Sequence, residues 1–284
     1  MPMNPNDMKF GLIGHPIAHS LSPALFRAGY DGRYQYDLIE SPDFEQAYER
    51  FIREYDGINV TAPFKELAFR KADILSDECR RIGAANLLVK TPEGVKAYNS
   101  DYLGVRLWLR EVAEGLKRTP PTPSSWAPPP AARGVARFSS PLPPPAVLIV
   151  GLGGAGKAAA EAARSLGMEV RILNRTIYNK DIWPLCEFRE EFRKADIVIY
   201  NLPVRIPQMD ELSDEDFGLG QPKHILEANY RNPSFDEELL GRMKKANPLA
   251  RYTEGRTWLL LQALTGYELF TGEKPDFSKM SAQI

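Results

Sequence analysis

The sequence has few of the residues that form covalent or metal cross-links. It contains two cysteines, Cys79 and Cys186, and three histidines. Two cysteines far apart in the chain do not make a disulfide framework, and neither they nor the histidines have the spacing of a zinc site. We therefore expect no bound metal and no disulfide, and we expect both cysteines to be reduced packing residues.

An excess of one charge and long apolar runs are also lacking. The 36 Lys and Arg residues are balanced by 37 Asp and Glu residues, so no basic excess favours nucleic acid or an anionic membrane surface. No apolar run approaches the roughly 20 residues that span a bilayer, and residues 1–9 lack the pattern of a targeting peptide. We expect a cytoplasmic protein without nucleic-acid or membrane partners.

The 284 residues are enough for two domains, each with a core of its own. Ten of the 24 prolines lie in residues 120–145, where proline favours extended conformations over a packed core. We interpret this segment as a linker or surface loop, and a docking motif for a proline-recognising partner is the alternative. The predicted organisation is a first domain at residues 1–118 completed by residues 252–284, a linker at 119–145, and a second domain at 146–251.

The first domain alternates short apolar runs with helical patterns, which predicts an α/β domain. Residues 42–55 have apolar side chains at helical spacing, and Ser22 before Pro23 is typical of a serine N-cap at a helix start. Residues 255–271 read as a helix that rejoins this domain. The other expected elements are strands at 10–13, 57–60, 86–90 and 95–98, and helices at 24–30, from Pro63 onward and from about Asp101.

The second domain repeats strand, turn and helix. Its expected strands, at 147–150, 169–173, 197–200 and 225–228, are continuous apolar runs, which indicates burial on both faces of a parallel sheet. A helix is expected at 155–166. The order predicts a Rossmann-like fold.

A glycine-rich loop follows the first of these strands. In a dinucleotide-binding loop Gly151 would make the tight turn, Gly153 would admit the pyrophosphate close to the backbone, and Gly156 would let the helix pack on the strand. Helix amides from Gly154 and Ala155 onward would face the anion. A purely structural glycine turn is the alternative, but the strand, loop, helix and second strand stand in the right order for a cofactor site.

The second strand ends in Asn174, Arg175 and Thr176. Sites specific for NAD usually have an acidic residue about 20 positions past the glycines, on the ribose 2′-hydroxyl. An acid would repel a 2′-phosphate, whereas a guanidinium pairs with it. We therefore expect NADP, bound by Arg175 with the assistance of Lys180. The alternative is that Arg175 is a solvated loop residue.

Polar side chains gather in three short segments of the first domain. These are Asn-Val-Thr-Ala-Pro-Phe-Lys at 59–65, Ala-Ala-Asn at 84–86 and Asn-Ser-Asp at 99–101. They supply an amine, a carboxylate and several neutral hydrogen-bonding groups. Such a set is typical of an enzyme that acts on a polyhydroxylated small molecule.

With these motifs the chain resembles the shikimate dehydrogenase family over nearly its whole length outside the linker. The segments that carry the resemblance are 14–23 (Gly-His-Pro-Ile-Ala-His-Ser-Leu-Ser-Pro), 59–65, 83–86, 99–101, the glycine loop, 174–176, and Gly255 with Gln262. The resemblance implies reversible, NADPH-dependent reduction of 3-dehydroshikimate to shikimate, in the chorismate route to aromatic amino acids. It also implies a substrate domain and an NADP-binding domain. We expect a monomer or a homodimer, and the sequence does not distinguish the two.

The resemblance also implies a role for each matching residue. Lys65 and Asp101 match the family's catalytic pair, and which of them moves the proton is left open. Ser20 and Ser22 match the hydroxyls that hold the substrate carboxylate. The expected binders of the ring hydroxyls are Asn59, Thr61, Asn86 and Gln262, with Tyr230 near the carboxylate; Asn86 as a turn residue and Tyr230 as a packing residue are the alternatives.

The chain departs from the family pattern in its long proline-rich insertion and at three further places. Leu202 and Pro203 follow Asn201 where the family continues Asn-Ala-Thr, in a loop that normally approaches the nicotinamide. Tyr102 replaces a glycine, and Ser100 replaces a threonine. Two other functions are kept as alternatives: a quinate/shikimate dehydrogenase that uses NAD, and a non-catalytic sensor of shikimate-like ligands.

Overall fold

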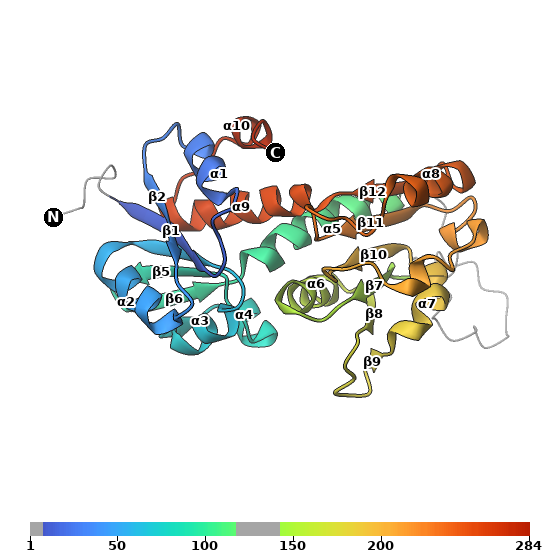
Figure 1. Cartoon of the computed structure of the whole chain (residues 1–284), viewed down its shortest axis with the longest axis horizontal. Coiled ribbons are helices and arrows are strands. Elements are labelled where there is room, and N and C mark those ends of the chain that lie inside the picture. The colour runs from blue at the N-terminus through green and yellow to red at the C-terminus, as the bar shows by residue number, and fades with distance from the viewer. Residues whose placement is uncertain (1–7, 118–142) are drawn as a thin grey trace, which may run out of the picture. The chain divides into compact units, whose positions relative to one another are not determined.

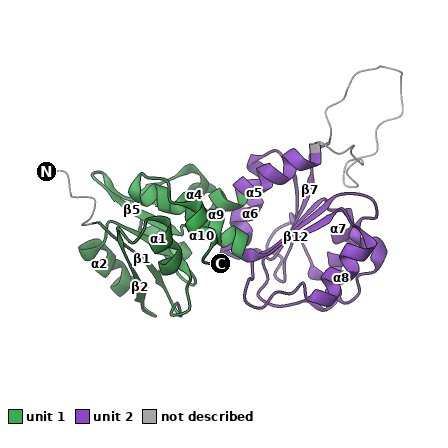
Figure 2. Cartoon of the chain, turned by 90° about the horizontal axis from the view of Figure 1, so that it is seen from above, with its two compact units in different colours: residues 1–105, 256–284 green, residues 106–255 purple. Residues whose placement is uncertain are grey.

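The computed structural model describes residues 8–117 and 143–284, and these form two compact units. Unit 1 consists of residues 1–105 and 256–284, and unit 2 of residues 106–255 (Figure 2). Most of the predicted linker lies outside the described residues. The functional assignment of the two parts as substrate and cofactor domains stays a prediction.

Unit 1 is built on a six-stranded mixed sheet in the order β2-β1-β3-β5-β6-β4 (Figure 1). Strands β1, β2 and β3 are parallel, and β5 runs antiparallel to both β3 and β6. The elements are β1 (Lys9–Gly14), α1 (Ser22–Gly29), β2 (Gln35–Glu40), α2 (Phe44–Glu54), β3 (Gly57–Val60), α3 (Lys65–Lys71), β4 (Ile74–Leu75), α4 (Asp77–Ile82), β5 (Leu87–Thr91), β6 (Gly94–Tyr98), the start of α5 (Ser100–Lys117), α9 (Gly255–Thr271) and α10 (Phe277–Ser281).

This pairing brings distant segments of unit 1 to one edge of its sheet. The parallel strands β1 and β3 end at the same edge, and Asn59 near the end of β3 lies opposite Leu87 at the start of antiparallel β5. Leu87 in turn pairs with Tyr98 at the end of β6. The residues that follow β1, β3 and β6 and those that precede β5 therefore meet at this edge.

The first helix differs from the prediction at its start. Helix α1 begins at Ser22 with Leu21 at the N-cap position and no side-chain cap, so the prediction of Ser22 as N-cap is wrong. The hydroxyl of Ser20 accepts the Ser22 amide hydrogen bond instead, at 3.2 Å. Ser22 is thus the first helical residue, and its side-chain oxygen does not cap its own helix.

Helices α5 and α9 approach each other closely within unit 1. A Cβ atom at Gly104 would lie 2.5 Å from the Gln262 backbone nitrogen, and one at Gly266 would lie 3.2 Å from Ser100 Cβ. Only small residues allow such an approach. The contact places the start of α5 beside Gln262.

Unit 2 has a six-stranded sheet that is parallel throughout, in the order β12-β11-β10-β7-β8-β9. This is the strand order of the dinucleotide-binding Rossmann fold, so the predicted fold class is confirmed. The elements are β7 (Ala146–Val150), α6 (Gly154–Ser165), β8 (Glu169–Leu173), β9 (Ile182–Trp183), η2 (Leu185–Glu187), α7 (Phe188–Lys194), β10 (Ile197–Tyr200), η3 (Pro207–Met209), η4 (Asp214–Phe217), β11 (Lys223–Glu227), α8 (Glu237–Ala246) and β12 (Ala250–Thr253).

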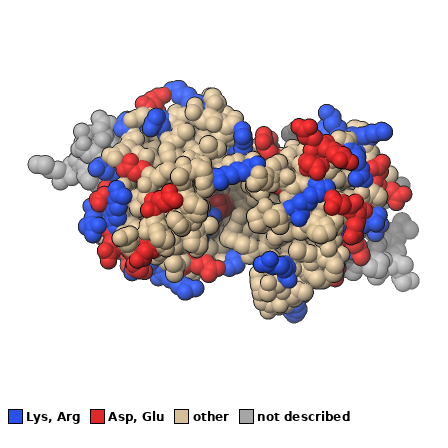
Figure 3. All heavy atoms as spheres, in the orientation of Figure 1, with Lys and Arg blue, Asp and Glu red and all other residues tan. Residues whose placement is uncertain are grey.

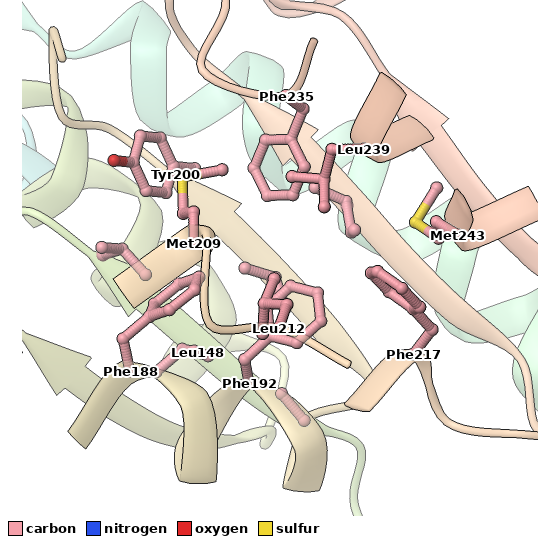
Figure 4. Close-up of a cluster of buried hydrophobic side chains, with 14 of the residues drawn as sticks. Leu148, Phe188, Phe192, Tyr200, Met209, Leu212, Phe217, Phe235, Leu239 and Met243 are labelled. Atoms are coloured by element: carbon pink, nitrogen blue, oxygen red, sulfur yellow. The ribbon is translucent and has the colours of Figure 1, made fainter. Parts of the chain in front are cut away.

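Aromatic side chains fill the core on one side of this sheet. Phe188 and Phe192 from α7, Tyr200 from β10 and Phe235 point toward one another (Figure 4). Each fully buried large apolar side chain contributes on the order of 2 kcal/mol to stability.

The ammonium of buried Lys223 lies next to this core. It donates to Phe192 O at 2.6 Å, within α7, and to Ala195 O at 2.5 Å, just after α7.

The sequence analysis missed four strands and misplaced one cysteine. Strand β2 buries only Ile39 fully, and β4, β9 and β12 are two to four residues long, so none shows the apolar run that marks a buried strand.

Cys79 packs in the core, and burial raises the pKa of its thiol to about 12. Cys186 is exposed, so the prediction that it is a packing residue is wrong.

On the face drawn in Figure 3, basic and acidic side chains are interspersed over both units.

Within residues 8–117 and 143–284, none of the helices has the length and apolar content needed to cross a membrane. In the same part of the chain, no group of three or more His, Cys, Asp or Glu side chains could hold a metal ion.

Candidate functional sites of the two units

Lys65 and Asp101 form an ion pair at the polar edge of the unit 1 sheet. Lys65 Nζ lies 2.5 Å from Asp101 Oδ2, and the two side chains are 20% and 14% exposed. Lys65 is the first residue of α3, and Asp101 is in the first turn of α5. A carboxylate is stabilised at a helix N-terminus by the amide groups there. The pair therefore combines a proton donor with a fixed anion, and it still has access to solvent.

The start of α5 is held by the residue before it. Asn99 is fully buried, and its Oδ1 accepts a hydrogen bond from the Tyr102 amide at 3.0 Å while its Nδ2 donates to Ala84 O at 3.0 Å. Trp258 Nε1 donates to the backbone oxygen of Asp101 at 3.0 Å. Asp101 is thus fixed from both sides, by an N-cap and by a side chain of α9.

Two predicted amide side chains meet at Ser100, and a third contacts one of them. The Ser100 hydroxyl lies 2.8 Å from Gln262 Oε1 and 3.3 Å from Asn86 Oδ1, and the Ser100 amide donates to Asn86 Oδ1 at 2.6 Å. Asn59 Nδ2 donates to Asn86 O at 3.4 Å. The side-chain oxygens of Asn86 and Gln262 are therefore engaged within the protein. Their NH₂ groups make no hydrogen bond to another described residue and can serve a ligand.

The other predicted substrate residues of unit 1 lie near this edge. Ser20 Oγ donates to Ser22 Oγ at 3.2 Å, and the Thr61 amide donates to Ile13 O at 2.9 Å. A Cβ at Gly14 would lie 2.4 Å from Thr61 Cγ2, so the segments after β1 and β3 touch. The structure thus brings together residues that the sequence places more than forty positions apart.

Two side chains of this region were missed by the sequence analysis. Ser100 links Asn86 to Gln262, and its place inside the Asn-Ser-Asp motif was the available signal. Tyr36, in β2, donates its hydroxyl to Asn59 Oδ1 at 2.7 Å. Burial holds the pKa of Tyr36 well above its ordinary value of 10, so the hydroxyl keeps its proton and orients the Asn59 amide. No motif surrounds Tyr36, and only the pairing of β2 with β1 reveals it.

The glycine loop of unit 2 leads from β7 into α6. Gly151 has φ of +91°, and a Cβ there would lie 2.8 Å from Leu202 Cδ2. A Cβ at Gly156 would lie 2.0 Å from the backbone oxygen of Gly151. Both positions therefore require glycine for the fold itself, as predicted for the tight turn and for close packing of the helix.

Gly153 differs from these two glycines. It is the N-cap residue of α6, it has φ of −71°, and a Cβ there would meet no atom within 4 Å. Helix α6 begins at Gly154 with no side-chain cap hydrogen bond, so no capping side chain competes with a ligand for its first amides, including that of Ala155. Space and free amides at a helix N-terminus suit a pyrophosphate. The residues present therefore fit a dinucleotide.

The segment after β8 carries the predicted specificity residues. Arg175 and Thr176 are exposed, and the described residues offer Arg175 no ion-pair partner. Asn174 Oδ1 accepts a hydrogen bond from the Leu152 amide of the glycine loop at 3.1 Å. The guanidinium is thus available for an anionic ligand beside the glycine loop.

Two further positions of unit 2 bear on the predictions. Leu202 packs against Gly151, so this departure from the family pattern contributes to the wall of the glycine loop.

Tyr230 follows β11 and is half-buried, and the Arg231 guanidinium lies 5.9 Å from its ring centre. Its role near the substrate carboxylate stays a prediction.

Comparisons with known proteins agree with this geometry. The family model described as the shikimate dehydrogenase substrate binding domain matches residues 12–88. The chain belongs to the shikimate dehydrogenase family. The model of the NAD binding domain of D-isomer specific 2-hydroxyacid dehydrogenases matches residues 132–253, the part of the chain that has the Rossmann strand order.

Relatives and solved structures extend the match. The NADP(+) shikimate dehydrogenase of Acidiphilium cryptum is 36% identical over 172 residues, which are 58% of this chain and 53% of that protein. That of Thermotoga maritima is 30% identical over 212 residues, 73% of this chain and 64% of that protein. The matched segments thus span about half to two thirds of these relatives. The structure of shikimate 5-dehydrogenase from Thermus thermophilus in complex with NADP(H) and shikimate aligns with a TM-score of 0.70 at 27% identity, over 97% of this chain and 98% of that one.

Proposed function

We propose that this chain is an NADP-dependent dehydrogenase that reversibly reduces 3-dehydroshikimate to shikimate. The observation that carries the proposal is the Lys65–Asp101 pair, 2.5 Å apart, next to Ser100 with its bound amide side chains, in a chain that also has a dinucleotide-type glycine loop. The names of the relatives support the same substrate and cofactor. A location in the cytoplasm and a monomeric or homodimeric state stay predictions.

Reduction of a ketone to an alcohol requires a proton at the oxygen as the hydride reaches the carbon. The bound nicotinamide would supply the hydride. Lys65, as an ammonium, can donate a hydrogen bond to the ketone oxygen and stabilise the negative charge that develops there. Asp101 holds the ammonium in place and can accept a hydrogen bond from a neighbouring ring hydroxyl. In the oxidation direction Lys65, as a neutral amine, would take the proton.

The amide and hydroxyl side chains would bind the rest of the ring. With their oxygens engaged by Ser100, Asn86 and Gln262 present NH₂ groups, which can donate to oxygen atoms of the substrate. Ser20 and Ser22 would donate to the carboxylate. These neutral donors hold an anion without the strong attraction of a paired cation, which suits a product that must leave.

The first experiment measures nicotinamide absorbance with shikimate or quinate and with NADP or NAD, in all four pairings. Turnover with shikimate and NADP alone is the expected result. Turnover with quinate or NAD would assign the chain to a quinate/shikimate dehydrogenase, and ligand binding without turnover in any pairing would assign it to a sensor.

A substitution at Arg175 tests the cofactor half of the proposal. Arg175→Ala should lower kcat/KM with NADP by about tenfold to a hundredfold, because a charge-assisted contact to the 2′-phosphate is lost. Kinetics with NAD should be unchanged. Arg164→Ala is the matched control, because it removes the same charge from the last turn of α6, at the opposite end from the glycine loop. Equal losses with NADP and NAD would remove Arg175 from the 2′-phosphate site.

A further inference from the structure

The side chain of Asn174 is fully used inside unit 2. Its Oδ1 accepts from the Leu152 amide at 3.1 Å. Its Nδ2 donates to Thr176 O at 2.9 Å and to the hydroxyl oxygen of Tyr178 at 3.1 Å. An amide has two N–H donors, and both have a partner here. Asn174 is therefore a positioning residue that ties the glycine loop to the segment from Arg175 to Tyr178.

Tyr178 is the residue at the far end of this chain of hydrogen bonds. Its hydroxyl is anchored to Asn174, yet 57% of the residue is exposed. The packed core of unit 2 does not include its ring. An exposed aromatic ring whose hydroxyl is already anchored is suited to stacking against a flat partner. It loses less conformational freedom on binding than an unanchored side chain would.

We propose that the ring of Tyr178 is the stacking surface for the adenine base of the cofactor. The inference rests on the proposed function and assigns a residue outside the glycine loop and Arg175 to cofactor binding. In a Rossmann fold the adenosine ribose lies at the end of the second strand, which is β8 here. Arg175, three residues before Tyr178, would hold the 2′-phosphate, so both contacts would be made by one loop.

The chemistry of the loop favours adenine over the nicotinamide end as the partner of Tyr178. The tether through Asn174 leads to Leu152, just after Gly151, so the ring is held at the β8 side of the glycine loop. Every nucleobase presents a flat face that aromatic side chains bind without base-specific hydrogen bonds. Ile177, next to Tyr178, is 53% exposed and offers an aliphatic side chain that cannot stack in this way.

The test measures binding of adenosine 2′,5′-bisphosphate by calorimetry, because this ligand contains the adenine and the 2′-phosphate but no nicotinamide. Tyr178→Ala should raise its Kd about tenfold. Tyr178→Phe keeps the ring and loses the tether, so its Kd should rise only about twofold to threefold. Ile177→Ala is the matched control and should bind like the wild type. Thermal unfolding of each variant checks that the exposed substitutions leave the fold intact.

The outcomes separate this inference from the proposed function. If the wild type binds the bisphosphate and Tyr178→Ala binds it equally well, the stacking role is overturned and the dehydrogenase proposal stands. If the affinity for the bisphosphate falls as much in Tyr178→Phe as in Tyr178→Ala, the ligand depends on the hydroxyl and not on the ring. That result also overturns the stacking role. If the wild type binds neither the bisphosphate nor NADPH, the inference and the proposed function fall together.

Discussion

The candidate sites of the two units are built in opposite ways. In unit 1 the polar side chains come from the segments after β1, β3 and β6, from the start of β5 and from α9, and the site exists only where these meet. In unit 2 the glycine loop is a single continuous stretch whose backbone makes the site. A side-chain site therefore depends on the whole sheet, whereas a backbone site depends on which positions lack a side chain.

The same contrast appears in two poorly exposed lysines. Lys65 is held by the carboxylate of Asp101 and keeps some exposure. Lys223 is buried and donates to two backbone carbonyls, and burial lowers its pKa to about 7. A paired, partly solvated ammonium can exchange a proton with a ligand, whereas one enclosed in the core acts on stability alone.

The largest effect is expected from breaking the side-chain pair. Lys65→Ala should lower kcat for shikimate oxidation by about a hundredfold to ten-thousandfold, because the proton acceptor is lost. The Kd for NADPH should stay the same. Lys71→Ala is the matched control, because Lys71 ends the same helix and pairs with exposed Glu45. Initial rates and NADPH fluorescence titration measure both quantities. Activity of Lys65→Ala within a few-fold of the wild type would refute the catalytic role.

A pair of alanine substitutions separates the two kinds of glycine in the backbone site. Gly153→Ala should raise the Kd for NADPH on the order of tenfold, because the added methyl group occupies space meant for the pyrophosphate. Its stability should fall by about 1 kcal/mol or less, the size of a helix-cap effect. Titration with NADPH and urea unfolding measure the two changes.

Gly156→Ala should behave in the opposite way. The added Cβ would lie 2.0 Å from Gly151 O, so unfolding in urea should require about 1–3 kcal/mol less free energy. Comparable losses of stability in both variants would mean that Gly153 is also a structural glycine, and the contrast between them would disappear.

The buried lysine gives a pH-dependent effect of intermediate size. The folded pKa of Lys223 is about 7, against an ordinary value of 10.5. Between these values the unfolded chain binds a proton that the folded chain does not, so this group makes the folded state more stable as pH rises, by up to about 1.4 kcal/mol per pH unit. Lys223→Met should remove this rise between pH 7 and 9.

Urea unfolding at pH 7, 8 and 9 measures the effect of Lys223→Met. Lys244→Met, on the exposed last turn of α8, should keep the dependence of the wild type. An unchanged pH dependence in Lys223→Met would show that the buried ammonium keeps its proton through its two carbonyl acceptors.

The smallest effect is expected at Ser100, which links the amides of unit 1. Ser100→Ala removes the hydroxyl that lies 2.8 Å from Gln262 Oε1, so Gln262 can turn away from the ligand. KM for shikimate should rise about threefold to tenfold with little change in kcat. Ser278→Ala, at an exposed position of α10, should have no effect. If Ser100→Ala has wild-type kinetics, the substrate does not depend on the Gln262 orientation.

Much of the fold was predictable because its signals are local. The apolar runs of β7, β8, β10 and β11 and the glycines between β7 and α6 predicted the parallel sheet, which the strand order confirms. Strand β2 escaped detection because it is an edge strand with one fully buried residue. The cap of α1 was assigned wrongly because Ser22 before Pro23 is typical of an N-cap, whereas the backbone is already helical at Ser22 and places Leu21 at the N-cap position.

The candidate site was predictable as a set of residues but not as a network. The motifs contained Lys65, Asp101 and Asn86, and the family membership they indicated is confirmed. The sequence carried no signal for Tyr36, which acts on Asn59 through a hydrogen bond from β2 to β3, two strands that are separated by β1 in the sheet. The predicted roles of the site residues stay predictions until the variants are measured.

The sequence by itself determined the α/β class, the position of the glycine loop, the absence of an acidic residue after β8 and the chemical groups available for catalysis, because each depends on residue type or on spacing along the chain. Tertiary structure decided which of these groups meet. The antiparallel β5 brings Asn86 to Asn59, the close approach of α5 and α9 brings Gln262 to Ser100, and the chain of hydrogen bonds through Asn174 anchors Tyr178. Contacts of this kind depend on packing between segments far apart in sequence or on the path of a loop, and no local pattern of residues encodes them.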